Sequence, residues 1–194
     1  MEFNEREMDI LQDTSFLLTK AVALQKVEAL LVDTRSAIEG VTEASAFDFP
    51  PGAVLSGGKV SRGENYLGLP YRILDQPALL TADDIFALRT MFWWGHFFSV
   101  TLHLQGASLE RYREGLVERF DRLLTGQYYI SVGESPWEYH YGRENYTRLD
   151  PTHRAHLQAC EFLKLSRKKE IGAWREVPRF AADFLEELLR VLSG

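Results

Sequence analysis

Two histidines stand in a strongly aromatic stretch of the chain, RTMFWWGHFFSVTLHLQG at residues 89–106. Histidine gains and loses a proton near neutral pH, so each of the two is a candidate for acid–base chemistry. The second half of the stretch alternates between apolar and mixed positions, which is typical of an extended strand. On this pattern His96 shares the apolar side and is expected to be a core residue. His103 shares the mixed side with Ser99 and Thr101 and is therefore the predicted catalytic histidine of the two.

A third histidine lies close in sequence to a carboxylate, where residues 137–141 read WEYHY. In an extended strand Glu138 and His140 project from the same face, two residues apart. If that face adjoins the one that carries His103, two imidazoles and a carboxylate converge and can serve as an acid–base pair or bind a metal. The spacing fixes no distance between the two strands. We therefore predict catalytic roles for His103, Glu138 and His140, and expect no metal site.

A loop bounded by glycines, KVSRGENYLGLPYRILD at residues 59–75, is crowded with polar recognition groups. Glycines let the backbone turn sharply, and loops carry binding residues disproportionately. Arg62 can grip a carboxylate or phosphate through two parallel hydrogen bonds, which predicts an anionic small molecule as the ligand. The competing interpretation is that Arg62 and Glu64 pair with each other and hold the loop together. The candidate substrate-binding residues are Lys59, Arg62, Glu64, Asn65 and Tyr66.

Composition argues against several other classes of function. The 194 residues carry a formal net charge of −6, which opposes binding to the phosphate backbone of a nucleic acid. No run reaches the roughly 18 consecutive apolar residues of a membrane-spanning helix, so no membrane association is expected. Neither type of glycine-rich phosphate loop, GxGxxG or GxxxxGK, is present, and we predict no cofactor. The single Cys160 cannot form an internal disulfide, and residues 1–15 do not resemble a secretory leader, which favours the cytoplasm.

One long helix is predicted over residues 14–44, which contain no proline and no glycine before Gly40. Apolar residues recur there every seven positions and form a single seam. A helix of about 30 residues is far longer than the usual 11 or 12, so it must cross a whole domain or pair with a second copy. We favour a helix laid across a sheet, and a homodimer through this helix remains the alternative. The seam residues are Ile10, Leu17, Leu24, Leu31 and Ile38.

The remaining pattern predicts strands interleaved with helices. Strands are expected near 57–62, 70–75, 96–105 and 161–166, and three short strands within 127–149. Helices are expected over 82–93, capped by Thr81, Asp83 and Asp84, over 108–124, just after Pro151, and over 177–192. This order predicts a single α+β domain over residues 1–194, with a mainly antiparallel sheet packed against helices.

Two segments together, SRGENYLGLPYRILDQP and RTMFWWGHFFSVTLHLQG, resemble an uncharacterised family of small bacterial cytosolic proteins of unknown function. The resemblance covers residues 57–106, about a quarter of the chain. It implies a bacterial, cytoplasmic setting. It implies no activity, cofactor or catalytic residue.

The leading functional hypothesis is a non-enzymatic cytosolic protein that binds partners or assembles with itself, as a homo-oligomer and most simply a dimer. The alternative is a small enzyme of hydrolase or transferase type that acts on an anionic small molecule. In that enzyme Arg62 holds the substrate, and His103 or His140 moves protons with the help of Glu138. The enzyme requires these side chains to meet in one pocket. The binding protein requires only an exposed apolar surface.

Overall fold

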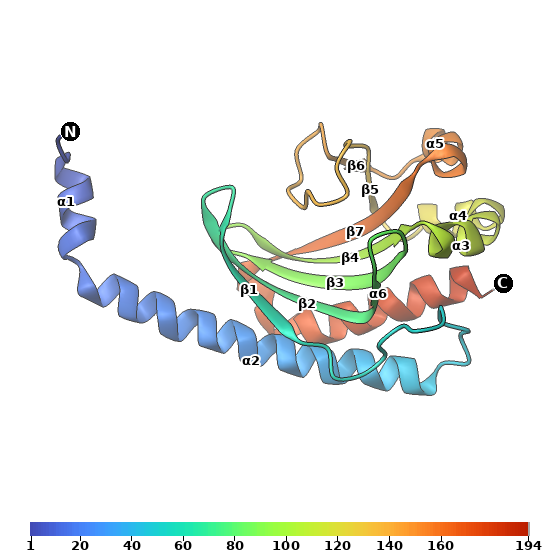
Figure 1. Cartoon of the computed structure of the whole chain (residues 1–194), viewed down its shortest axis with the longest axis horizontal. Helices are drawn as coiled ribbons and strands as arrows, with labels where there is room; N and C mark the ends of the chain where they lie inside the picture. Colours follow the sequence, from blue (N-terminus) through green and yellow to red (C-terminus); the bar gives the residue numbers. More distant parts are fainter. Residues whose placement is uncertain (194) are drawn as a thin grey trace.

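A seven-stranded antiparallel sheet forms the centre of the protein (Figure 1). The structure is a computed structural model that describes residues 1–193. The strands are β1 (Val60–Tyr66), β2 (Leu69–Leu80), β3 (Ile85–Trp93), β4 (Phe97–Gln105), β5 (Tyr129–Ser131), β6 (Tyr146–Arg148) and β7 (Phe162–Glu170). Their order in the sheet is β1-β2-β3-β4-β7-β5-β6. The first four strands are therefore consecutive neighbours, whereas β7 returns from late in the chain to pair with β4.

Helices cover one face of this sheet. Two long helices, α2 and α6, pack against each other beneath the strands, and α3, α4 and α5 gather at one end (Figure 1). The helices are α1 (Glu5–Gln12), α2 (Thr14–Ala44), α3 (Ala107–Glu118), α4 (Phe120–Leu124), α5 (Arg154–Ala159) and α6 (Val177–Leu192), with 3₁₀ turns η1 (Pro151–His153) and η2 (Ile171–Glu176). The predicted α+β class, antiparallel sheet and long N-terminal helix are confirmed. No helix within residues 1–193 is both long and apolar enough to cross a membrane.

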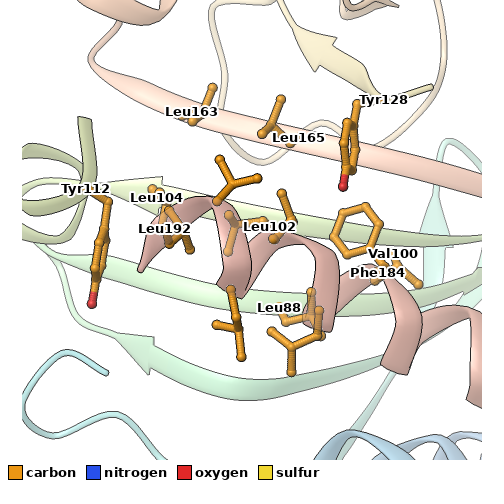
Figure 2. Close-up of a cluster of buried hydrophobic side chains, with 14 of the residues drawn as sticks. Leu88, Val100, Leu102, Leu104, Tyr112, Tyr128, Leu163, Leu165, Phe184 and Leu192 are labelled. Atoms are coloured by element: carbon orange, nitrogen blue, oxygen red, sulfur yellow. The ribbon is translucent and has the colours of Figure 1, made fainter. Parts of the chain in front are cut away.

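The main core lies between the sheet and α6, and it depends on the alternation of β4. Val100, Leu102 and Leu104 are fully buried on the helix side of that strand, where Phe184 of α6 packs with them (Figure 2). Burial of each such side chain contributes about 1.5–3 kcal/mol. The predicted parity of residues 97–105 is confirmed.

The helix α2 follows its predicted seam for most of its length. Asp13 caps its first turn, since the carboxylate accepts a hydrogen bond from the backbone N–H of Phe16 at 3.0 Å. Leu24, Leu31 and Ile38 are buried against the sheet and α6. The seam therefore packs within the chain along the sheet, as the favoured interpretation expects, while the helix before Leu24 continues beyond it.

The helix predicted over residues 82–93 is wrong, because most of this segment is strand β3. Nearly every side chain from Ile85 to Trp93 is buried, so the segment shows neither a helical nor a two-residue period. The expected capping residues form a hairpin turn instead. The backbone N–H of Thr81 donates to the carbonyl oxygen of Asp84 at 3.0 Å, and the Thr81 hydroxyl accepts a hydrogen bond from the N–H of Asp84 at 3.0 Å. Threonine and aspartate are favoured both at helix N-caps and in turns, which explains why the sequence predicts a helix here.

The three strands predicted within residues 127–149 are also only partly correct. The structure has two, β5 and β6, and residues 132–145 between them form a long irregular segment. This segment lies over the sheet face opposite the helices (Figure 1). Its polar groups bond to side chains of that face, so they need no strand partner. The predicted helix at 108–124 is present but is divided at Arg119 into α3 and α4.

The start of α3 requires a close approach of two backbone segments. Gly106 precedes the helix with φ of 63°, and a Cβ atom there would overlap the backbone oxygen of Asp83. The neighbouring Asp84 carboxylate accepts a hydrogen bond from the N–H of Ser108 at 2.7 Å. Asp84 thus caps a helix that is distant from it in sequence.

We predict that Gly106→Ala lowers the free energy of unfolding by more than about 2 kcal/mol, since it adds strain at positive φ to a backbone clash. Gly68→Ala is the matched control, because Gly68 has φ of 82° but open space around it. It should cost about 1–2 kcal/mol. Urea unfolding of both variants measures the difference, and equal losses would contradict the assigned clash.

Candidate functional site

The predicted anion-binding arginine lies in an ion-pair network that fastens α2 to the sheet. Arg62 reaches Glu28 of α2 at 2.6 Å, and Arg72 binds the same carboxylate at 2.7 Å. Glu64 accepts from Lys20 at 3.0 Å and from Arg72 at 3.3 Å. Arg62 and Glu64 therefore hold the helix and not each other, so the competing interpretation of an internal pair is wrong. The Arg62 charge is paired with Glu28, a carboxylate that it shares with Arg72.

The other polar residues of β1 do not gather around Arg62. Lys59 is exposed just before the strand. The Asn65 side chain accepts a hydrogen bond from the N–H of Gly68 at 3.1 Å and so closes the turn to β2. Lys59 and Asn65 do not join Arg62, whereas Arg62 and Glu64 line a small pocket of about 360 Å³ together with Lys20, Glu28 and Arg72.

Tyr66 points to the opposite face of the sheet, where it meets one of the predicted catalytic residues. Its hydroxyl accepts hydrogen bonds from the backbone N–H groups of Tyr139 and His140 at 2.6 and 3.1 Å. The same oxygen lies 3.1 Å from Nδ1 of His140, whose Nε2 lies 2.9 Å from Glu144. Tyr66 and His140 are thus brought together, and they anchor the segment 132–145 to the end of β1.

His103 lies on the mixed face of β4, as predicted, but it is sealed from solvent. Its side chain packs edge-on against Trp137 and Phe162 and is 2% exposed. Burial, together with the positive charges of Lys164 and Arg89, lowers its pKa to about 3. The imidazole is therefore neutral at physiological pH, and its Nε2 has no hydrogen-bond partner within residues 1–193.

The predicted catalytic group does not assemble around His103. Glu138 contacts the buried residues with its backbone and not with its carboxylate: its carbonyl oxygen accepts a hydrogen bond from Lys164. His140 is occupied by Tyr66 and Glu144. None of the hydrogen bonds among the described residues links Glu138 or His140 to the His103 imidazole.

A buried polar layer fills the space between the sheet and the segment 132–145. Arg89 of β3 forms a two-pronged pair with Asp75 of β2 at 2.7 and 2.8 Å, and donates to the Tyr139 hydroxyl at 2.7 Å. Burial raises the pKa of Tyr139 to about 12, although the Arg89 charge opposes that rise. Beside this group the hydroxyls of Thr101 and Ser166 lie 2.7 Å apart. The strand register places these residues in one row, so the layer is continuous across four strands.

Lys164 of β7 is the most unusual member of the polar layer, because its side chain is fully buried. The amine lies over the rings of Tyr139 and Tyr146, 4.4 and 5.0 Å from their centroids. Burial and the nearby Arg89 charge lower its pKa to about 7. Neither Lys164 nor Arg89 was predicted as a site residue. Both residues lie on the mixed sides of their strands. To predict them as site residues, one needs to know where β3 and β7 begin and end and which strands they pair with.

His96 does not belong to the core, contrary to the prediction. It is exposed in the turn between β3 and β4, where its ring stacks on Trp93 with centroids 3.6 Å apart. Gly95, with φ of 76°, reverses the chain just before it. The alternation of β4 therefore begins one residue later, at Phe97.

Outside the polar layer, the most conspicuous surface feature is the N-terminal arm, defined as residues 1–22. The helix α1 and the start of α2 project away from the sheet (Figure 1), and none of the residues of α1 is buried. Near the end of the arm, Lys20 pairs with Glu64 of β1 at 3.0 Å. Nine of the sixteen large apolar side chains that are exposed among residues 1–193 lie in it. They are Met1, Phe3, Met8, Ile10, Leu11, Phe16, Leu17, Leu18 and Val22.

An apolar pocket of about 510 Å³ opens next to the point where the arm leaves the sheet. Val27 and Leu30 of α2 form one wall. The hairpin between β3 and β4 contributes Trp94, and η2 contributes Trp174. The side chain of Trp174 is 43% exposed, so the pocket is continuous with the surface.

Comparison with known proteins identifies no relative: no family model, no curated protein and no solved structure matches the chain. Among the described residues, no three histidine, cysteine, aspartate or glutamate side chains are grouped so that they could hold a metal ion. The function must therefore be argued from the geometry.

We predict that Lys164 makes stability increase with pH. Between pH 7 and 10.5 the unfolded chain holds the lysine proton while the folded chain does not, so raising the pH favours folding. From pH 7 to 9.5 the contribution is on the order of 3 kcal/mol. Urea unfolding at these two pH values should show that Lys164→Met removes the increase. The exposed Lys59→Met should retain it, and a full increase in Lys164→Met would contradict the assignment.

Proposed function

We propose that the protein is a non-enzymatic assembly protein, in which the N-terminal arm of one copy docks on the apolar pocket of a second copy. The concentration of exposed apolar side chains on the arm carries this proposal. Monomeric soluble proteins seldom expose such contiguous apolar surface, and where it occurs it marks an interaction site.

The arm needs a partner to be stable as a helix. Isolated helices shorter than about 12–15 residues are marginal in water, and most helical stability comes from burial of an apolar face. The eight residues of α1 have a capping box at Asn4 and Glu7 but bury nothing. A stable interface buries about 800 Å² on each partner, and nine large apolar side chains provide surface of that order.

The position of the pocket favours a second copy as that partner. Arm and pocket adjoin on one chain, because Ala23 and Val27 line the pocket directly after the arm ends. A two-fold axis at this place lets each arm reach the pocket of the other copy, which makes a closed, self-complementary dimer.

Charge supports the same pairing. The arm carries five acidic residues, Glu2, Glu5, Glu7, Asp9 and Asp13, against the two bases Arg6 and Lys20. Lys26 lines the pocket and Arg175 lies over Trp174, and neither forms an ion pair within residues 1–193. An acidic arm thus approaches a basic rim, which favours the correct orientation and speeds association.

The enzyme alternative has less support. Its proton carrier His103 is sealed and neutral, Arg62 is paired with Glu28, and Glu138 and His140 are not joined to His103. Burial also raises the pKa of the Cys160 thiol, which disfavours a thiolate nucleophile. A single unpaired cysteine fits the reducing cytoplasm of a bacterium, and the acidic net charge disfavours a nucleic-acid partner.

We expect the wild-type protein to have twice its 22.3 kDa monomer mass in size-exclusion chromatography with light scattering. The double variant Leu11→Asp/Leu18→Asp places charges on the apolar face of the arm and should raise the dimer dissociation constant at least 100-fold, because each buried leucine is worth about 1.5–3 kcal/mol. The matched control Gln12→Asp/Thr19→Asp adds the same charges one residue later and should leave the mass unchanged.

A variant on the other side of the interface tests the docking geometry. Trp174→Ser removes an exposed ring from the pocket and should weaken the dimer while the thermal unfolding temperature of the monomer stays the same. A wild-type protein that remains a 22.3 kDa monomer at high concentration would overturn the proposal.

A further inference from the structure

The sheet is open along the second half of β7. Strand β5 pairs only with Leu165 and Ser166 of β7, so residues 167–170 have β4 on one side and no strand on the other. A cleft of about 900 Å³ lies at this place, far in sequence from the arm. Backbone and side chains from β4, β5, β6, β7 and α6 form its walls.

Four cationic side chains line the cleft, and two of them are free. Arg167 is bound by Glu187 of α6, and Lys169 is paired with a carboxylate of η2. Arg148 and Lys168 form no ion pair with any acid within residues 1–193. The cleft therefore holds two cations without an ion-pair partner among residues 1–193, together with the carboxylate of Glu170.

The register of the strands places both free cations on one face. Tyr129 pairs with Arg148 on one side and with Ser166 on the other, and Lys168 follows Ser166 by two residues. The Arg148 guanidinium lies 5.2 Å, and the Lys168 amine 5.8 Å, from the centroid of the Tyr129 ring. The two charges thus lie near the same aromatic surface.

The remaining groups of the cleft define what can rest there. Phe97 adds apolar surface near Tyr129, since the Lys168 amine lies 5.8 Å from the centroid of each ring, and this surface suits a flat or aliphatic group. Glu170 follows Lys168 by two residues on the same face, about 6.6 Å along the strand. Its carboxylate repels a second anion, so it directs the negative end of a ligand toward Arg148.

We infer that this cleft binds a small organic anion, whose carboxylate or phosphate group lies between Arg148 and Lys168 and whose apolar part rests on Tyr129. An arginine binds such a group through two parallel hydrogen bonds, and a lysine adds a point charge. The cleft is complete in one copy of the chain, so this inference does not depend on the proposed dimer.

Isothermal titration calorimetry with phenyl phosphate, benzoate and inorganic phosphate as separate probes tests the inference. We expect at least one of the two aromatic anions to bind with a dissociation constant of about 0.1–1 mM, and inorganic phosphate to bind more weakly, because it cannot use the apolar floor. Arg148→Gln and Lys168→Gln should each weaken binding about tenfold.

The control is Arg143→Gln, which removes the same charge from an exposed site outside the cleft. It should bind as the wild type does, and thermal unfolding should show that all three variants are folded. The dimer-breaking Leu11→Asp/Leu18→Asp variant should also bind normally, which separates the cleft from the arm. Equal affinities for Arg148→Gln and Arg143→Gln, or no binding of any probe at about 10 mM, would overturn the inference.

Discussion

The structure depends on the different covering of the two faces of the central strands β3, β4 and β7. Their helix-facing side chains form the core with α2 and α6, and their other side chains form the polar layer together with an apolar cluster that includes Met91, Trp93 and Phe97. A shift of one residue in the register of β4 would place His103 among leucines and Leu102 among charged groups. The burial of the core therefore fixes where every polar group of the opposite face must stand.

Part of this fold could be predicted from the sequence because some segments have one buried face. Thr14–Ala44, Val177–Leu192 and the alternation of β4 all show a period that matches their environment. Ile85–Trp93 is buried on both faces, so its period is lost, and its flanking turn residues have the composition of a helix cap. Residues 132–145 are held by side-chain contacts across the sheet, which no local pattern records.

The functional residues were harder to predict than the fold, for a related reason. The neighbouring residues predict which face of β4 carries His103. The burial of the His103 side chain depends on Trp137 and Phe162, which are distant in sequence. The partner of Arg62 proved to be Glu28, which lies 34 residues before it. A single sequence indicates which face a side chain occupies. It does not indicate which other segment will cover that face.

The place of β7 between β4 and β5 has a consequence for how the protein is made. Residues 97–105 leave the ribosome long before residues 162–170, their neighbours in the sheet. At 5–20 residues per second, the delay between the ends of these strands lasts roughly 3–13 s. During that interval the growing chain displays an unsatisfied strand edge, which is a template for aggregation. The helix α6 follows β7 in the chain and adds its buried face to the core later still.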